Sequence, residues 1–525
     1  MERSDLLSQL AKLPREPQPS DLARVFSNLD GHFAVVARAP SWTFAAVDSV
    51  RSIPLAFARF SGQWCIDDQA LRLRNAVGLG AGDLDSEAAL ALGMAGYTID
   101  IATLYRGLQQ LGPGELVLFS REGEPRCYRY HCYRPWRGDK PAYDSAKSQK
   151  ALTETTLALI DATMKGIGDR TLVVPLSAGR DSRLIVSAAH HLGYGNIRTF
   201  AYGKPGNHEA ETSRAIAERL GFPWRFVPVE VTMMRRYFQS ETHASYCAFA
   251  DTLQSVLFVQ DLPQIAVLKA DGFIPSDAVL CNGNSGDYIS GAHIVPEMCS
   301  VAKGLPDEQR LQRIVGALFK KHFGLWTTLQ TPTNRARIER QLLASLARAG
   351  ATLGDPSDDY GLYEYAEFQD RQCRYVITGQ RIYEFLGHEW RLPLWEKAYL
   401  DFFEAVPLAG KVNQRLYADM LTAENWGDVW RDVPVNAKTV RPHWIRPLRL
   451  LAKAAHSPLG REAWHRFERR YFQYWMEGGA HSAIKPYRTV ARDRRGARNA
   501  IAWLTEAYLN SHGLTYDGQP LAAHV

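Results

Sequence analysis

Residues 173–185, with the sequence VVPLSAGRDSRLI, constrain the fold of this chain more than any other stretch. An apolar run, typical of a strand covered on both faces, leads directly into Ser-Ala-Gly and then into a charged, helix-like segment. In such an arrangement, backbone N–H groups and the helix N-terminus face the crevice at the carboxyl end of a parallel sheet. The sequence therefore predicts an α/β fold with an anion site at residues 177–182.

The acidic residue inside this loop, Asp181, indicates how the anion is held. A carboxylate repels a phosphate directly but fits one when Mg²⁺ lies between them. The loop has neither the GxxxxGK[ST] nor the GxGxxG pattern, so it is neither a Walker A loop nor a dinucleotide loop. The alternative is that Ser177 and Asp181 only cap a helix that follows a strand.

The hydrophobic periodicity changes along the chain. Residues 31–135 contain short, partly alternating apolar runs that predict strands, interrupted by a helix at 86–96. Residues 145–165 have the period of an amphipathic helix, and strand-like and helix-like segments then alternate to residue 230, as in βαβ units. Beyond residue 300 the pattern is mostly helical, with a loop near 352–359.

Composition limits the class of protein. The chain has 525 residues, 46% of them apolar and 22% charged, which predicts a soluble globular protein of two or three domains. The N-terminal residues lack the pattern of a secretory signal, and the longest uncharged apolar stretch, residues 88–99, is too short to span a bilayer. Seven irregularly spaced cysteines without a CxxC pair predict free thiols and no metal site. We therefore expect a cytoplasmic protein.

Positive charge is concentrated near the C-terminus. Between Lys438 and Arg498 there are 15 Lys and Arg residues against four Asp and Glu, while the whole chain has a net charge of +6. Aromatic residues are interleaved with these bases. One interpretation is a surface that contacts anionic lipid at the inner face of the membrane, or a phosphate-bearing carrier. The other is a solvated helical face whose aromatic residues lie in the core. No nucleic-acid-binding module is recognisable, so no nucleic-acid partner is expected.

Four segments, in the same order, resemble the asparagine synthetase family, which includes β-lactam synthetases and lasso-peptide cyclases. SAGRDS (177–182) resembles the Ser-Gly-Gly-x-Asp-Ser pyrophosphatase loop. Residues 200–221 resemble the next strand, Gly-x-Pro-Gly loop and helix, and CNGNSGDYISG (281–291) resembles the Gly-x-Gly-x-Asp loop. Residues 387–407 resemble the Glu-x-Arg-x-Pro segment. The resemblance covers roughly residues 150–425.

This resemblance implies an AMP-forming ligase that uses ATP and Mg²⁺. The substrate carboxylate is adenylated with release of pyrophosphate, and an amine then displaces AMP. By position in the motifs, Asp181 and Asp287 would hold Mg²⁺. The pyrophosphate loop would be Leu176, Ser177, Ala178, Gly179 and Ser182, and Tyr202 and Gly283 would line the adenine. Glu209 matches an acidic position of the family, but it also suits the first turn of a helix.

Three departures from the family pattern concern chemistry. Ala178 replaces a glycine, which is tolerable if its φ is negative. Asn284 stands in the catalytic position where asparagine synthetases have Glu and β-lactam synthetases Tyr, and it cannot act as a base. The family's late lysine, which neutralises the leaving pyrophosphate, has no clean match, and Arg415 is a nearer candidate than Lys411.

Residues 31–60 and 103–119 resemble parts of the glutaminase half of asparagine synthetase. That enzyme needs a cysteine directly after the initiator Met, whereas here residue 2 is Glu and the first cysteine is Cys65. We therefore expect a degenerate glutaminase-like αββα domain at 1–140, a parallel-sheet ATP-pyrophosphatase synthetase domain at 141–430 and a basic helical extension at 431–525. Nitrogen would come as free ammonia, as ammonia from a partner glutaminase, or from an amine substrate.

The substrate expected first is a sugar uronic acid of bacterial surface polysaccharide, free or linked to a nucleotide or lipid. Arg183, Arg381 and Arg391 are candidates to bind its carboxylate, because arginine binds carboxylates bidentately. For Arg391, a structural ion pair with Asp or Glu is the interpretation that we favour over substrate binding. Two alternatives stay open: a peptide or natural-product cyclase, and a non-catalytic ATP-binding partner protein.

The N-terminal sequence predicts that the purified protein has no glutaminase activity. Cys65 lies inside the chain, so it cannot supply both the nucleophile and the α-amino base of an N-terminal cysteine. Glutamate release from glutamine should therefore equal the protein-free rate. Clear turnover of glutamine by the purified protein would contradict the degenerate-domain interpretation.

Overall fold

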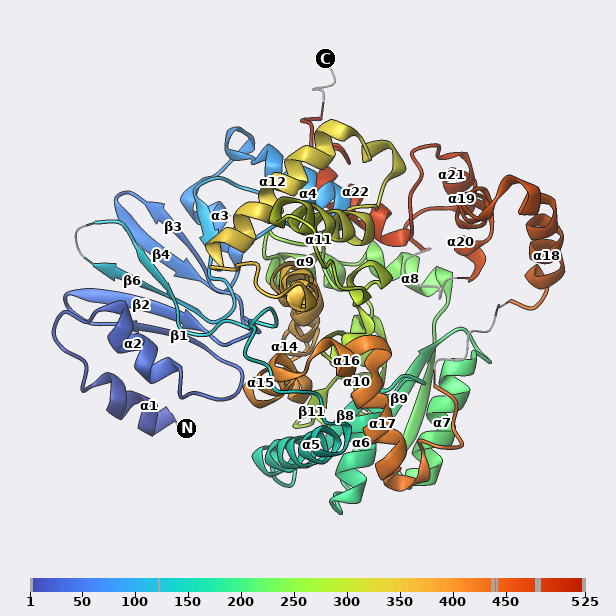
Figure 1. Cartoon of the computed structure of the whole chain (residues 1–525), viewed down its shortest axis with the longest axis horizontal. Coiled ribbons are helices and arrows are strands. Elements are labelled where there is room, and N and C mark those ends of the chain that lie inside the picture. Colours follow the sequence, from blue (N-terminus) through green and yellow to red (C-terminus); the bar gives the residue numbers. More distant parts are fainter. Residues whose placement is uncertain (1–2, 121–122, 436–439, 441, 477–482, 522–525) are drawn as a thin grey trace.

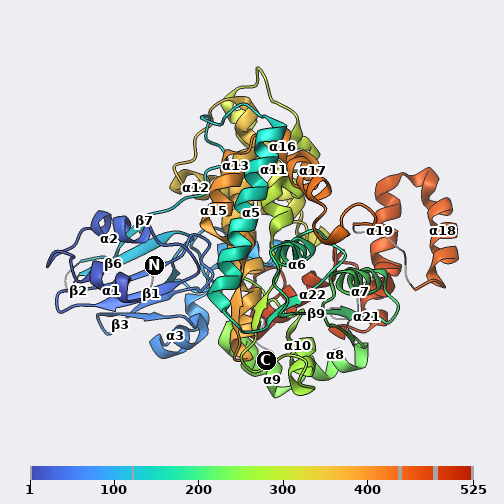
Figure 2. The same cartoon turned by 90° about the horizontal axis from the view of Figure 1, so that it is seen from below.

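The computed structural model describes residues 3–120, 123–435, 440, 442–476 and 483–521. Along its longest axis, antiparallel sheets of the N-terminal residues lie at one end (Figure 1, left). A body with a parallel sheet and many helices follows, and C-terminal helices lie at the opposite end. Seen from below, α18 (Ile445–His456) and α19 (Arg461–Tyr471) form an outlying part on the side away from the N-terminal sheets (Figure 2).

The N-terminal strands form two antiparallel sheets. The first has the order β1-β2-β6-β7, with β1 (Ala34–Arg38), β2 (Trp42–Val47), β6 (Glu115–Ser120) and β7 (Arg126–Arg129). The second has the order β4-β3-β5, with β3 (Ala56–Phe60), β4 (Gln63–Asp67) and β5 (Leu108–Gln110). The strands predicted between residues 31 and 120 are therefore confirmed.

Alternation along these strands produces four layers. On β6, Leu116 and Leu118 pack towards α2 (Pro19–Phe26), while Val117 and Phe119 face the second sheet. Side chains on the far face of that second sheet join the main core with α3 (Ala70–Val77) and α4 (Ser86–Ala95). Because successive side chains point to opposite faces of a sheet, each of the two sheets has apolar residues packed on both faces. The layers follow the expected order of helix, sheet, sheet and helix. Helix α1 (Arg3–Leu10) precedes α2.

The five-stranded sheet is parallel throughout. Its order is β10-β9-β8-β11-β12, with β8 (Leu172–Pro175), β9 (Ile197–Gly203), β10 (Trp224–Pro228), β11 (Val279–Cys281) and β12 (Glu389–Arg391). Helix α5 (Ser145–Ile167) precedes β8, α6 (Asp181–His191) follows β8, and α7 (His208–Leu220) follows β9. After β8 the chain adds β9 and β10 on one side and then returns to place β11 on the other. The crevice between β8 and β11 is therefore the switch point at which such sheets bind ligands.

Helices make up most of the rest, as predicted. Between the strands and in the central body they are α8 (Val231–Phe238), α9 (Glu241–Ala250), α10 (Leu262–Ala270), α11 (Asp307–His322), α12 (Pro332–Arg348), α13 (Asp359–Glu367), α14 (Arg381–Phe385), α15 (Lys397–Ala405), α16 (Leu408–Lys411) and α17 (Arg415–Glu424). The C-terminal ones are α18 (Ile445–His456), α19 (Arg461–Tyr471), α20 (Gln473–Met476), α21 (Tyr487–Arg492) and α22 (Ala500–Ser511). Helix α22 packs on α4, so C-terminal residues contact the N-terminal third of the chain. No helix among the described residues has the length and apolarity to cross a bilayer.

The basic C-terminal segment has a small core of its own. Ile445, Trp464 and Phe472 are buried together, which matches the interpretation that its aromatic residues are core. Three of its described arginines pair with acidic residues: Arg449 with Glu468, Arg466 with Glu462, and Arg495 with Asp493 and Glu506. On α18, by contrast, Leu448, Leu450 and Leu451 are more than half exposed. Lys438, where the basic segment begins, lies outside the described residues.

A buried ion pair ties three distant segments together. The Lys411 ammonium lies 2.7 and 2.9 Å from the two Glu364 carboxylate oxygens and 3.0 Å from the Tyr133 hydroxyl. The Lys411 and Glu364 side chains are only 0% and 2% exposed. The backbone of Lys411 also lies against Gly291, where no Cβ fits. This pair therefore fixes α13 and α16 beside the loop that follows β11.

Removing the cation of this pair should destabilise the protein strongly. Lys411→Met leaves the buried Glu364 carboxylate with the Tyr133 hydroxyl but without its cation, which costs about 3–5 kcal/mol of folding free energy. Lys397→Met is the matched control, since its partner Asp401 is on the surface and such a pair contributes at most about 1 kcal/mol. Thermal unfolding measures both variants. Equal unfolding temperatures for the two would contradict a structural role for the buried pair.

Candidate active site

The site begins where β8 ends. Pro175 closes the strand, Asp181 begins α6, and the residues between them form the predicted loop. The loop is held from inside: the Ser177 N–H donates to the Ser182 hydroxyl at 3.1 Å, and the Gly179 N–H donates to the Ser177 hydroxyl at 3.1 Å. Ala178 does not have a positive φ, so its methyl group causes no backbone strain.

A second loop, which follows β11, presses against the first. A Cβ on Gly283 would lie 2.5 Å from the backbone nitrogen of Ser182, and one on Gly286 would lie 2.8 Å from the Asp181 carboxylate. Only glycine permits this approach. It allows the Asp287 N–H to donate to Asp181 Oδ2 at 2.8 Å, so the two predicted metal ligands come together.

The two carboxylates have opposite electrostatic environments. Removal from water and the charge of Asp287 raise the pKa of Asp181, although the Asp287 N–H and the Tyr417 hydroxyl donate to it. Partial burial raises the pKa of Asp287, but the hydrogen bond and charge of His293 outweigh it and leave that pKa lowered. Two carboxylates close together, one of them short of positive partners, suit a bound cation.

These loops line a cavity of about 480 Å³ at the carboxyl ends of the strands. From the first loop and its helix come Leu176, Ser177, Gly179, Arg180, Asp181 and Ser182; from the second come Asn282, Gly283, Asn284 and Asp287; and Phe200, Tyr202, Glu209, Phe258, Gln260, Asp261 and Gln414 complete the wall. Most of the predicted site residues thus meet here, and Ala178 is buried directly behind the loop. The volume suits a nucleotide.

Part of the cavity wall is apolar, and a few polar side chains lie in the wall as well. Leu176, Phe200 and Phe258 contribute the apolar surface. The Tyr202 hydroxyl donates to Asp261, a residue that no sequence motif had indicated. Burial raises the pKa of Glu209, which lies in the cavity wall as well as in the first turn of α7. The position of Glu209 is thus compatible with both interpretations.

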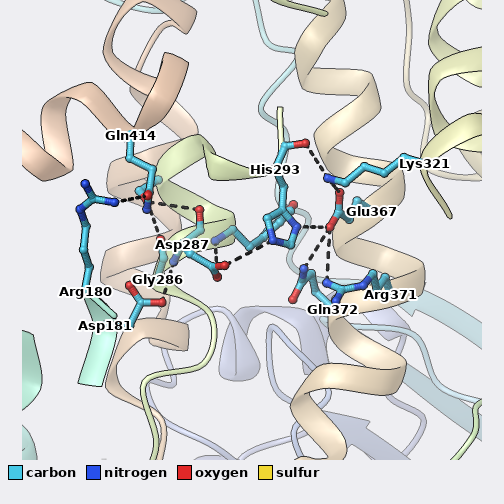
Figure 3. A network of polar contacts seen from close by, with 12 residues as sticks. Arg180, Asp181, Gly286, Asp287, His293, Lys321, Glu367, Arg371, Gln372 and Gln414 are labelled. Atoms are coloured by element: carbon cyan, nitrogen blue, oxygen red, sulfur yellow. Dashed lines mark hydrogen bonds and ion pairs between the residues drawn. The ribbon is translucent and has the colours of Figure 1, made fainter. Parts of the chain in front are cut away.

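The cation in the cavity wall comes from the first loop. Arg180 is the only Lys or Arg among the described residues that line the cavity, and its Nη1 donates to Gln414 Oε1 at 2.9 Å. Gln414 in turn donates to the Ser290 hydroxyl at 2.7 Å (Figure 3). The predicted Arg415 points elsewhere: its side chain is 63% exposed and faces Asp419 at 3.9 Å.

Behind Asp287, a chain of charged groups leads away from the cavity. His293 Nε2 lies 3.4 Å from Asp287 Oδ2, and His293 Nδ1 bonds to Glu367 (Figure 3). Although burial alone lowers the pKa of His293, the charges of Glu367 and Asp287 raise it to about 9. Glu367 also contacts Lys321, His322, Arg371 and Gln372. His293 thus holds Asp287 in place, and sequence motifs gave no signal for it.

The three arginines expected to bind a substrate carboxylate lie outside the cavity wall. Arg183 is buried, donates to backbone carbonyls of Ala178, Val429, Val433 and Pro434, and stacks on Trp430. Arg381 is buried against Glu384 and Phe249, and Arg391 pairs with Glu389. All three therefore hold the fold together. Arg183 in particular fixes the segment 429–434 to the back of the phosphate loop.

Asn284 lies in the cavity wall, where the family position requires it. Its backbone N–H donates to Asn282 Oδ1 at 3.1 Å, and its amide side chain can hydrogen-bond but cannot accept a proton. Cys65 lies on β4 in the second N-terminal sheet and is partly buried. No cluster of three or more metal-binding side chains occurs in the described part of the chain. Two carboxylates suffice when phosphates complete the coordination of Mg²⁺.

Comparison with known proteins agrees with this geometry. The sequence model of asparagine synthase matches residues 157–423, which include both loops, α17 and every strand of the parallel sheet. A search of curated proteins found no significant match. Because the matched segment is more than half of the chain and contains the whole cavity wall, this protein belongs to the asparagine synthase family of ATP-using, AMP-forming carbon–nitrogen ligases.

Proposed function

We propose that this protein activates a substrate carboxylate with ATP and transfers the acyl group to ammonia or an amine. The observation that carries the proposal is the meeting of Asp181 and Asp287 at the switch point, above a cavity of nucleotide size. A carboxylate oxygen attacks the α-phosphorus, the bond to the β-phosphate breaks, and pyrophosphate leaves. The amine nitrogen then attacks the acyl carbon, the bond to AMP breaks, and the nitrogen loses a proton.

The chain's own residues support this chemistry in distinct ways. Asp181 and Asp287 would hold Mg²⁺, which neutralises phosphate charge when bound. The N–H groups of the first loop and the N-terminus of α6 would bind the β- and γ-phosphates. Arg180 faces the same space and would stabilise pyrophosphate as it leaves. His293 orients Asp287, and Asn284 would hydrogen-bond the substrate without taking its proton.

Arg180 and Gln414 indicate another origin for the cation than the one that the family resemblance implies. In relatives, a lysine late in the domain neutralises the pyrophosphate, and in this chain Gln414 occupies the cavity wall near that point. Because Arg180 donates to Gln414, its guanidinium lies beside the site that a lysine at 414 would occupy. We infer that the positive charge has moved from α17 to the phosphate loop.

A sugar uronic acid, converted to its uronamide, remains the substrate to test first. Pyrophosphate–ATP exchange should be measured over uronic acids, amino acids and linear peptides, with ammonium as the later nitrogen donor. Exchange with a peptide alone would favour a cyclase. Nucleotide binding without exchange for any acid would favour a non-catalytic partner protein and contradict the proposal.

Neutralising either carboxylate should abolish adenylation without unfolding the protein. Asp181→Asn and Asp287→Asn should each lower pyrophosphate release at least about 10²-fold, since each removes a ligand for the ion that neutralises phosphate charge. The unfolding temperature of Asp181→Asn without nucleotide should not fall, because the change relieves repulsion with Asp287. Asp169→Asn, an exposed residue just before β8, is the control. Near wild-type release by either variant would remove that residue from the metal site.

The position of the cation can be tested by moving it. Arg180→Met should slow pyrophosphate release by about 10²-fold, as the loss of one preorganised charge does elsewhere. Adding Gln414→Lys to that variant should restore part of the rate, because an ammonium then enters the cavity from the residue just before α17. Arg415→Met tests the sequence-based expectation. A large loss with Arg415→Met and none with Arg180→Met would overturn the assignment of Arg180.

A further inference from the structure

Two adjoining cavities lie beyond His293, on the side away from the phosphate loop. The first, of about 280 Å³, is lined by side chains that include His293, Lys321, Arg371 and Arg498. The second, of about 200 Å³, lies among α19, α20, α21 and the start of α22. Arg498 and Asn499 line both cavities, so the two adjoin.

Positive charge dominates these walls. The described Lys and Arg residues that line the two cavities are Lys321, Arg371, Arg466, Arg469, Arg470, Arg494 and Arg498. The only described acidic residue in either wall is Asp493, and Arg495 already pairs with it at 2.8 Å. Below the first cavity, the single carboxylate of Glu367 is shared by Lys321, Arg371 and two histidines. The walls thus carry more positive charge than the protein itself neutralises.

The arginines where the two cavities meet repel one another electrostatically. Partial removal from water lowers the pKa of Arg498, and the positive charges of Arg469 and Arg371 lower it further. Within the described residues, neither Arg469 nor Arg494 has an ion-pair partner, although both face the second cavity. Like charges held together in a concave wall favour an anionic ligand that the protein does not itself provide.

The first of these cavities is linked to the proposed reaction centre through one side-chain contact. His293 lines the first cavity and also contacts Asp287, which lines the nucleotide cavity (Figure 3). In the same view, Lys321 and Arg371 lie on the far side of His293, around Glu367. A substrate whose carboxylate reaches the α-phosphorus near Asp287 therefore has a positively charged recess beside it.

The second cavity comes from the part of the chain beyond the family match. That match ends at residue 423, whereas Arg466, Arg469, Arg470, Arg494 and Arg498 all follow it. The nucleotide site and the His293, Lys321 and Arg371 side of the first cavity belong to the matched segment, and α19–α22 add most of the second cavity. Such an addition suits recognition of the particular substrate rather than of ATP.

We propose that the two cavities bind a phosphate or diphosphate group carried by the carboxylate substrate. This inference rests on the proposed function, since it places the second anionic end of the molecule that is adenylated. Arginine is the side chain best suited to phosphate, because its planar fork donates two parallel hydrogen bonds. The substrate class is thus an organic acid that carries a phosphate or diphosphate group. An example is a uronic acid whose anomeric oxygen is bonded to that phosphate.

The first experiment compares substrates of increasing phosphate content. Pyrophosphate release is measured with glucuronic acid, glucuronic acid 1-phosphate and a nucleoside-diphosphate glucuronic acid. We expect KM to be at least about tenfold lower for the phosphorylated acids than for the free acid, the effect of one charge-assisted hydrogen bond. An isoprenyl-diphosphate-linked acid forms the lipid arm, and a still lower KM there would identify a lipid carrier. Equal KM values for free and phosphorylated acids would overturn the proposal.

Arginine variants test which side chains cause the lower KM for phosphorylated acids. Arg469→Gln, Arg494→Gln and Arg498→Gln should each reduce the KM advantage of the phosphorylated acid, by about tenfold where the lost arginine contacts the phosphate. Arg488→Gln is the matched control, because it removes the same charge from an exposed position on α21 outside both cavities. An equal loss in the control would show a general charge effect and contradict a built site.

A binding measurement separates this proposal from the proposed function. The full-length protein is saturated with a non-hydrolysable ATP analogue and Mg²⁺, and glucuronic acid 1-phosphate is then titrated by calorimetry. Binding that the three arginine variants weaken supports the recess even if no acid is adenylated. Adenylation of free acids with no binding of the phosphate probe supports the ligase and overturns the recess.

Discussion

The site depends on the close approach of two loops across the switch point between β8 and β11. Gly283 and Gly286 allow the second loop to reach the backbone and carboxylate of the first, and a single Cβ at either position would separate them. Only this contact brings Asp181 and Asp287 together, with the Asp287 N–H bonded to the Asp181 carboxylate. Everything proposed about the nucleotide follows from it, since two apposed carboxylates beside helix N–H groups suit phosphates that carry a metal ion.

Charged side chains lie on two sides of this contact. On one side, Arg180 faces the cavity and is held by Gln414, so the cation comes from the phosphate loop rather than from α17. On the other side, His293 holds Asp287 and is itself held by Glu367. The buried pair of Lys411 and Glu364 anchors the second loop from behind, through the contact of Lys411 with Gly291. Nucleotide chemistry and fold stability thus use different lysines and arginines, although they lie close together.

The C-terminal helices add a feature that the shared fold lacks. They pack on the N-terminal third through α22 and α4, and their arginines extend the positively charged wall that begins at Lys321 and Arg371. The ATP site thus lies within the matched segment, whereas these arginines lie beyond it.

Sequence alone determined the features that depend on neighbouring residues. The apolar run of β8, the small residues after it and the amphipathic period of α5 are local patterns. Asp181, Asp287, Tyr202 and Gly283, which the family motifs singled out, lie in the wall of one cavity. Only the tertiary structure decided which charged side chains face that cavity. Arg183 and Arg381 lie in suggestive motifs but turn into the core, whereas Arg180 meets a glutamine 234 residues away and His293 a glutamate 74 residues away. Tertiary packing determines which polar side chains meet when they are so far apart in the sequence. The hydrophobic periodicity of the sequence shows only which face of a helix or strand is buried, so it does not predict such partners.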